Sequence, residues 1–194
     1  MTMDLKPILD IAALVVGTLF LVLQILHHKW MWPVDIVSCI ILLVIYIPDR
    51  VWGLSILQFY YMVMAVVGIF SWNRDEELNA GRDKKIIMHR LTAPVALCSL
   101  AILIVGFAVT YLILSHFNDP APVPDALVLV LGIVATWWLT RSYPGQWILW
   151  IIADGISVYL SLEVGLRGPA LLYVFYTVSS IVGYINWRKN GVFV

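Results

Sequence analysis

Residues 147–187 decide the fold and read WILWIIADGISVYLSLEVGLRGPALLYVFYTVSSIVGYINW. Two apolar runs make up this stretch, residues 147–162 and residues 168–187, and a glycine and an arginine in residues 165–167 separate them. Such runs are typical of helices that cross a membrane, where about 20 apolar residues span roughly 30 Å of hydrocarbon. The first run is short, so we expect longer neighbouring helices to bury it.

The same arrangement occurs a second time, earlier in the chain. An offset of 115 residues aligns the first three apolar runs with the last three without a gap. Apolar helices resemble each other by composition alone, so the identities at glycine, tryptophan and tyrosine carry the argument. The matched pairs are Gly17 with Gly132, Trp32 with Trp147, Ile36 with Ile151, Gly53 with Gly168, Tyr61 with Tyr176, Gly68 with Gly183 and Trp72 with Trp187. These pairs predict an internal duplication.

The composition of the 194 residues excludes a water-soluble fold. Hydrophobic residues make up 62% of the chain and charged residues 12%, against roughly 45–50% and about 25% in soluble domains. Twelve basic residues balance twelve acidic ones, so the chain lacks the positive footprint of a protein that binds nucleic acid. Cys39 and Cys98 stand in apolar runs without a second ligand nearby, so we expect no disulfide, no metal site and no cofactor.

Seven apolar runs are separated by loops too short for a further domain. They cover residues 7–26, 33–47, 52–72, 91–114, 126–140, 147–162 and 168–187. Because three is an odd number, two copies of a helical triplet point the same way only if one unrepeated helix joins them. We therefore predict an all-α integral membrane protein with seven transmembrane helices in 3+1+3 parallel repeats. The first repeat is residues 1–72, a cytoplasmic linker and central helix follow in residues 73–124, and the second repeat is residues 125–194.

The positive charges predict the orientation in the membrane. Nine of the twelve Lys and Arg residues fall on one side of the predicted helices and three on the other. The positive-inside rule places the richer side in the cytoplasm, so we expect the N-terminus outside and the C-terminus inside. Residues 73–90 are then a solvated cytoplasmic linker. The run 7–26 exceeds a signal-peptide core and lacks a cleavage site, so we expect it to stay in the mature protein.

Ionisable residues inside membrane helices are costly, so they are the first candidates for function. Trp147, Trp150 and Asp154 stand at helix spacings i, i+3 and i+7, which puts two indoles and a carboxylate on one face. A flat cationic ring can stack on indoles with a cation–π attraction of about 0.5–2 kcal/mol, while the carboxylate supplies charge. In the alternative interpretation, both tryptophans belong to the interfacial aromatic belt and Asp154 pairs with another helix.

Further polar candidates lie on other predicted helices. Gln58 and Tyr61 lie near the midplane, and Tyr176 is the repeat partner of Tyr61. An amide and phenols at this depth suit the polar edge of a ligand, although buried tyrosines also bond to neighbouring helices. Asp35 follows Pro33 by two residues, so we expect it to accept hydrogen bonds from free N–H groups at a helix start.

Motifs of the common enzyme classes are missing from the sequence, including HExxH, GxSxG, a nucleotide-binding glycine loop and a Cys/His cluster. We therefore predict that the chain is not an enzyme and does not itself couple ATP to transport. One carboxylate in the middle of a predicted helix gives only weak evidence for an ion relay.

The chain closely resembles the PnuC family of bacterial vitamin transporters over nearly its whole length. In the second repeat the resemblance rests on QWILWIIAD at residues 146–154, followed by Val164-Gly165-Leu166, Leu172-Tyr173, Gly183-Tyr184 and Trp187-Arg188. In the first repeat it rests on Trp30-Met31-Trp32-Pro33 and on the run from Tyr60 through Gly68 to Trp72.

This resemblance implies a seven-helix fold like that of the SWEET sugar transporters and a place in the bacterial cytoplasmic (inner) membrane. It implies uptake of nicotinamide riboside by facilitated diffusion, with cytoplasmic phosphorylation trapping the product. The substrate-stacking tryptophans of the family match Trp147 and Trp150. Related carriers transport thiamine or riboflavin, and thiamine also has a positive ring, so these vitamins stay alternatives.

The resulting hypothesis is a passive vitamin carrier in the lipid bilayer, whose two triple-helix bundles rock around a central pocket. The predicted pocket residues are Trp147, Trp150, Asp154, Gln58, Tyr61 and Tyr176. A non-transporting membrane scaffold or accessory subunit and a small-solute channel are the competing classes. The sequence does not determine the oligomeric state; a homo-oligomer is compatible with its apolar surfaces.

Overall fold

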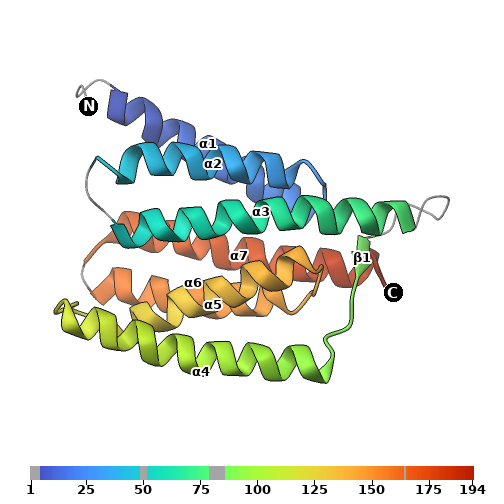
Figure 1. Cartoon of the computed structure of the whole chain (residues 1–194). Coiled ribbons are helices and arrows are strands. Elements are labelled where there is room, and N and C mark those ends of the chain that lie inside the picture. Colours follow the sequence, from blue (N-terminus) through green and yellow to red (C-terminus); the bar gives the residue numbers. More distant parts are fainter. Residues whose placement is uncertain (1–4, 49–51, 79–85, 164) are drawn as a thin grey trace. The chain divides into compact units, whose positions relative to one another are not determined.

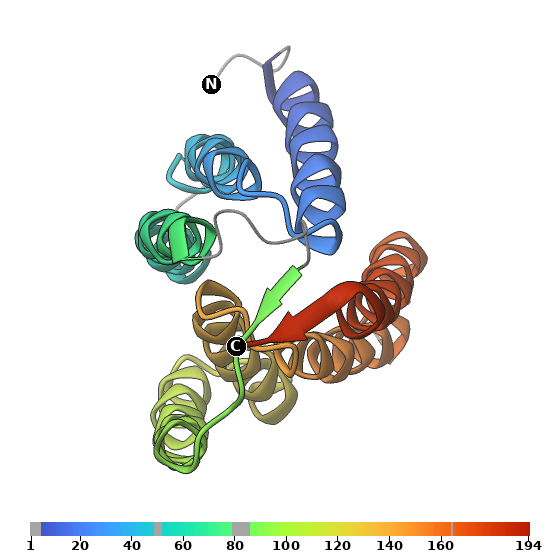
Figure 2. The same cartoon turned by 90° about the vertical axis from the view of Figure 1, so that its right-hand side faces the viewer.

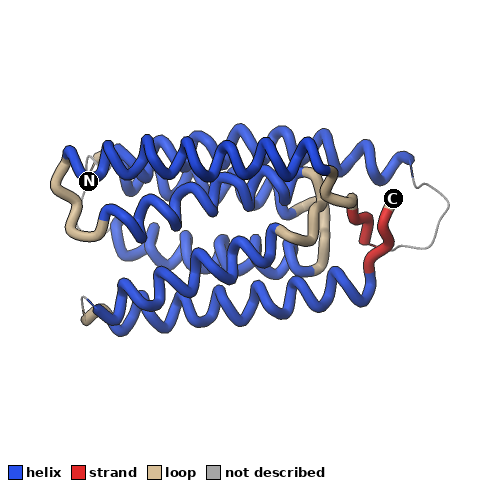
Figure 3. The backbone as a smooth tube through the Cα atoms, turned by 90° about the horizontal axis from the view of Figure 1, so that it is seen from below, coloured by secondary structure: helices blue, strands red, loops and turns tan. Residues whose placement is uncertain are grey.

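The structure, a computed structural model, describes residues 5–48, 52–78, 86–163 and 165–194 (Figure 1). Almost all of these residues are helical (Figure 3). The helices are α1 (Leu5–Ile25), α2 (Met31–Tyr46), α3 (Trp52–Leu78), α4 (Ala93–His116), α5 (Pro122–Thr140), α6 (Gln146–Glu163) and α7 (Arg167–Asn190). Two short strands, β1 (Ile86–Met88) and β2 (Gly191–Phe193), complete the described part. The prediction of an all-α protein with seven helices is confirmed.

The chain divides into two compact units, residues 1–85 and residues 86–194. In the first unit α2 packs against both α1 and α3. In the second unit α4, α5, α6 and α7 pack in chain order, each against the next. The unrepeated helix α4 therefore belongs to the second unit, whereas the sequence placed it with the linker in a section of its own.

The internal duplication is visible in the helix boundaries. A shift of 115 residues takes the start of α2 at Met31 onto the start of α6 at Gln146, and the start of α3 onto that of α7. The turns before α2 and α6 match as well, because His27 and Ser142 occupy equivalent positions and both have φ 51°. This left-handed conformation is uncommon for residues with a side chain. The two repeats thus share backbone geometry as well as sequence.

Helix length and composition suit a membrane. Five of the described helices are long and apolar enough to span one, namely α1, α3, α4, α5 and α7. The run 147–162, predicted to be a short helix, forms α6 with 18 residues, and the run 33–47 forms α2 with 16. In contrast, α5 begins at Pro122 rather than at residue 126 and reaches 19 residues. Prolines interrupt a helix interior but are tolerated in its first turn, so Pro122 and Pro124 do not end this helix.

Residues 73–90 do not form a wholly solvated linker. Helix α3 continues to Leu78, and β1 pairs in parallel with β2, with Ile86 opposite Gly191 (Figure 2). Met88 is buried by this pairing. The charges of the segment suggested a loop, but the run Ile86-Ile87-Met88 has the apolar, β-branched character of a strand. Residues 79–85 lie outside the described part of the chain.

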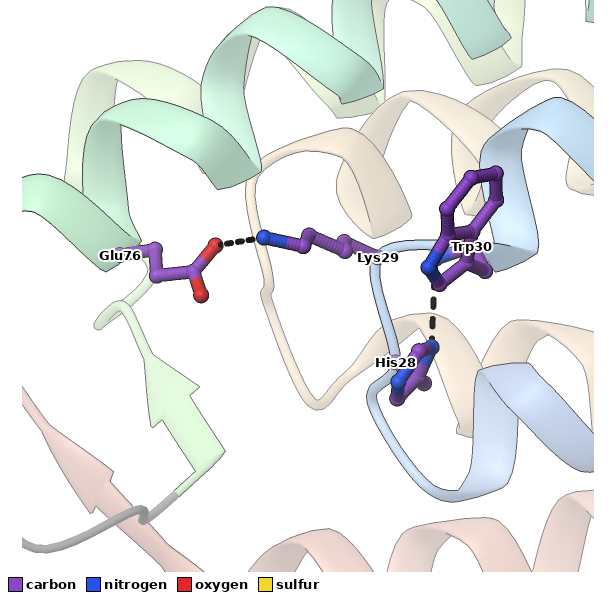
Figure 4. Close-up of polar contacts among 4 residues, drawn as sticks. All are labelled: His28, Lys29, Trp30 and Glu76. Atoms are coloured by element: carbon purple, nitrogen blue, oxygen red, sulfur yellow. Dashed lines mark hydrogen bonds and ion pairs between the residues drawn. The ribbon is translucent and has the colours of Figure 1, made fainter.

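The turn between α1 and α2 is fastened to the end of α3 within the first unit. Lys29 forms an ion pair with Glu76 at 2.8 Å, and the backbone N–H of Trp30 donates to Nδ1 of His28 at 3.3 Å (Figure 4). The ring of His27 stacks on Trp72, with centroids 3.9 Å apart and an interplanar angle of 6°. These contacts fix the middle helix of the unit against its neighbour at this end.

Candidate functional site

Trp147, the first tryptophan of the predicted site, lies in the first turn of α6 and is fully buried. Its ring packs edge-on against Trp187 of α7, with centroids 5.6 Å apart and planes at 89°. A Cβ atom on Gly183 would lie 2.5 Å from Cη2 of the indole, so the glycine permits this close approach of α7. The indole of Trp147 therefore fills the contact between α6 and α7 and leaves no exposed face.

The first repeat contains the same contact between its middle and last helices. Trp32 of α2 is fully buried and packs edge-on against Trp72 of α3, at 5.3 Å and 77°. It covers Gly68, where an added Cβ would overlap the indole. The tryptophan pairs of the sequence repeat, together with Gly68 and Gly183, are thus the packing core of each unit. Because the shared residues serve packing, positions at which the two repeats differ are the better candidates for ligand binding.

The two repeats differ one and two turns further along the middle helix. Trp150 of α6 occupies the position of Asp35 in α2, and Asp154 occupies the position of Cys39. Trp150 is half-buried and Asp154 is only 8% exposed. Among the residues that the structure describes, the Asp154 carboxylate has no hydrogen-bond or ion-pair partner. A costly, unpaired carboxylate inside a membrane helix marks a place for a cation or a hydrogen-bond donor.

Asp35 does not cap a helix start. Helix α2 begins at Met31, and no side chain caps it. Asp35 therefore lies a full turn inside the helix, where Sγ of Cys39 is 4.0 Å from its Oδ1. The expected capping role is wrong because Pro33 stands inside the first turn, a position that proline tolerates, instead of preceding the helix.

Tyr173 of α7 lies near Asp154, and Tyr176 lies beside Tyr173. The phenol of Tyr173 is within electrostatic range of the Asp154 carboxylate, and its ring meets Tyr176 edge-on with centroids 6.3 Å apart. Both tyrosines are half-buried. The sequence interpretation selects Tyr176 and misses Tyr173, although the repeat register pairs Tyr173 with Gln58. The second unit thus brings the Tyr173 phenol near the Asp154 carboxylate, with Tyr176 beside Tyr173 and Trp150 one turn from the carboxylate.

The remaining predicted site residues lie on α3 in the first unit. Gln58 is buried, and Tyr61 is half-buried with its ring centroid 5.7 Å from that of Tyr60. Both belong to a different unit from Asp154. That they join the residues of α6 and α7 in one pocket stays a prediction.

These features define a class of protein. A multi-pass chain with an internal repeat of three helices and one extra helix between the copies has the kind of architecture known among secondary transporters. A buried carboxylate beside aromatic groups is the kind of site that such proteins use for small molecules.

Comparison with known proteins identifies the family. A family model described as nicotinamide mononucleotide transporter matches residues 7–189. The chain belongs to this family, whose members are membrane transporters rather than enzymes. The resemblance seen in the sequence is thereby confirmed.

Individual relatives agree with this assignment. A crystal structure of the vitamin B3 transporter PnuC matches with a TM-score of 0.69 and 26% identity, and covers 93% of this chain and 80% of that one. The nicotinamide riboside transporter PnuC of Neisseria mucosa is 29% identical over 136 residues, 66% of this chain and 52% of that protein. The riboflavin/roseoflavin transporter RibM of Streptomyces davaonensis is 26% identical over 180 residues, 92% of this chain and 83% of that protein. The chain thus spans about half the length of the Neisseria relative.

Proposed function

We propose that this protein carries nicotinamide riboside across the bacterial cytoplasmic membrane by facilitated diffusion. The observation that carries the proposal is the buried, unpartnered carboxylate of Asp154, one turn from the half-buried indole of Trp150. Nicotinamide riboside joins a flat, positively charged pyridinium ring to a ribose. Such a ring gains about 0.5–2 kcal/mol over an indole face, and it supplies the positive charge that the carboxylate lacks within the described structure.

The other residues have supporting roles in this proposal. Tyr173 offers its phenolic hydroxyl to the ribose, because it lies within electrostatic range of Asp154, and the ring of Tyr176 lies beside it. Trp147 acts through packing, because its enclosed ring fixes α6 against α7 and so sets the direction of Trp150. Gln58 and Tyr61 of the first unit offer an amide and a phenol to the polar edge of the substrate.

The direction of uptake follows from trapping rather than from an energy source. The sequence has no nucleotide-binding loop that would couple ATP hydrolysis to transport. The carrier equilibrates the vitamin between the two sides, and phosphorylation by a separate cytoplasmic enzyme removes the product. The distribution of basic residues supports an orientation with the N-terminus outside and the C-terminus in the cytoplasm.

Riboflavin is the second candidate substrate, because the match to RibM covers most of both chains. Riboflavin has a neutral ring system, so it would gain stacking on Trp150 but no charge attraction to Asp154. Thiamine has a cationic ring and would use both groups. The contribution of Asp154 to binding therefore separates riboflavin from the two cationic vitamins.

Uptake by proteoliposomes that contain the purified chain alone tests the proposal. Labelled nicotinamide riboside should enter with saturable kinetics, and competition with unlabelled nicotinamide riboside, thiamine and riboflavin ranks the substrates. Asp154→Asn should raise KM roughly tenfold to a hundredfold, the usual loss when a charged hydrogen-bond partner is removed. Trp150→Ala should abolish uptake while the protein still inserts and stays folded.

Matched control variants change the same residue types elsewhere. Asp10→Asn alters an exposed carboxylate of α1, and Trp30→Ala removes an indole that is 60% exposed; both should transport like the parent chain. Uptake that fails to saturate would indicate a channel, and no uptake by an intact, reconstituted chain would indicate a scaffold. Normal transport of nicotinamide riboside by Asp154→Asn would refute the role given to the carboxylate.

A further inference from the structure

Positive charge gathers at one end of the second unit. Arg90 lies just before α4, Arg141 directly follows α5, and Arg188 and Lys189 lie in the last turn of α7. All four side chains are exposed. We refer to these four residues as the basic cluster.

The backbone holds the segments of the basic cluster together. Strands β1 and β2 pair in parallel, and the N–H of Val194 extends the pairing by donating to the carbonyl of Met88 at 2.9 Å. The next residue, His89, donates its N–H to the carbonyl of Ser142 at 3.3 Å. The segment before α4 is therefore fixed both to the end of α7 and to the turn after α5.

Two of the cations converge on one aromatic ring. The Cζ atoms of Arg90 and Arg188 lie 5.7 Å and 5.6 Å from the ring centroid of Phe193 in β2. Cation–π contacts at such distances restrain the guanidinium groups. Restrained guanidinium groups suit phosphate, whose oxygens accept paired hydrogen bonds from arginine.

No carboxylate side chain of the second unit lies at this end. Its carboxylates are Asp119 and Asp125 around the start of α5, Glu163 at the end of α6 and Asp154 within α6. The start of α5 and the end of α6 are the ends remote from Arg141. In the part of the chain that the structure describes, no member of the basic cluster forms an ion pair.

Helix dipoles explain some of these charges but not Arg90. Cations near the C-terminal ends of α5 and α7 are favourable, which accounts for Arg141, Arg188 and Lys189. Arg90 instead precedes the N-terminal end of α4, where the dipole is positive and Thr92 forms no side-chain cap. A bound anion would compensate both the arginine and this helix end.

We propose that the basic cluster binds the phosphate of an anionic phospholipid. A lipid fits better than a free phosphate because exposed apolar side chains lie next to the cations. Phe193 contacts Arg90 and Arg188, Val194 follows it and is exposed, and Leu97, one turn into α4, is 68% exposed. The headgroup phosphate would meet the guanidinium groups while the acyl chains run along the apolar face of α4. This inference is independent of which vitamin the chain carries.

Lipid binding to the purified full-length chain tests the proposal. Native mass spectrometry or lipid-dependent thermal stability in detergent would compare phosphatidylglycerol with phosphatidylcholine. Each basic residue near an anionic surface contributes about fivefold, so Arg90→Gln with Arg188→Gln should weaken phosphatidylglycerol binding about thirtyfold. Binding of phosphatidylcholine should not change, and Arg90→Lys with Arg188→Lys should retain most of the affinity.

Arg167→Gln is the matched control, because it removes an arginine at the opposite end of α7. The unfolding midpoint in detergent alone shows that each variant is folded. Equal binding of the two lipids by the parent chain, or parental binding by the double glutamine variant, would overturn the proposal. A stabilisation by glycerol 3-phosphate that depends on Arg90 and Arg188 would reveal a soluble-phosphate site and overturn the lipid assignment.

Discussion

Gly183→Ala should destabilise the second unit, and the structure sets the size of the effect. The new Cβ would lie 2.5, 2.6 and 2.8 Å from three ring carbons of Trp147, where carbon atoms prefer about 3.5–4.0 Å. The indole is fully buried with Trp187 packed against it, so it has nowhere to move. Overpacking costs about 1–3 kcal/mol, and the better helix propensity of alanine returns at most about 1 kcal/mol. We expect a net loss of about 1–2 kcal/mol.

Thermal unfolding in detergent, followed by size-exclusion chromatography with fluorescence detection, measures this loss. Gly155→Ala in α6 is the control, because no atom outside the local helix backbone lies within 4 Å of its added Cβ. That control should keep or raise the unfolding midpoint through helix propensity alone. Trp147→Phe combined with Gly183→Ala should recover part of the loss, since the smaller ring makes room for the methyl group.

A Gly183→Ala protein as stable as Gly155→Ala would refute the reasoning. A second refuting result comes from comparing Trp147→Phe in the parent chain and in the Gly183→Ala protein. If this substitution lowers the unfolding midpoint by the same amount in both, the two substitutions act independently. Trp147 would in that case be free to move and could face a ligand after all.

Two further predictions concern the ends of the units. Glu76→Gln breaks the ion pair with Lys29, but those side chains are 63% and 53% exposed, so the unfolding free energy should fall by less than about 1 kcal/mol; a larger loss in thermal unfolding would contradict this. Gly191→Ala places a Cβ against the carbonyl oxygen of Trp187 and 2.6 Å from Cε of Met88. It should detach β2, at a cost of about 1–3 kcal/mol, and raise amide hydrogen exchange in residues 86–88; unchanged exchange would show that the pairing does not depend on the glycine.

The sequence predicts the helices and the duplication well because both depend on local pattern. Apolar runs define seven helices, and the pairing of Trp32 with Trp147 and of Gly68 with Gly183 reflects a tryptophan packed on a glycine in each unit. Tertiary information is needed for the rest. The pairing of β1 with β2 joins segments about a hundred residues apart along the chain, and a short apolar run carries no signal of its partner.

The candidate site is predicted only in part, for a related reason. A tryptophan on a helix face gives the same sequence pattern whether its indole contacts a ligand or another helix. Trp147 and Trp150 are therefore indistinguishable in the sequence. In the structure Trp147 is enclosed and Trp150 is half-buried. The depth of Asp154 follows from its spacing, but its nearness to Tyr173 depends on how α6 and α7 pack.

The contact between a tryptophan and a glycine occurs once in each unit, so the same substitution can be made twice in one protein. Gly68→Ala and Gly183→Ala introduce the same methyl group against the same kind of ring in two different surroundings. The difference between their losses of stability therefore measures how well each unit can adjust its packing to the same added methyl group. In the unit that adjusts more easily, moving the helices past one another costs less free energy.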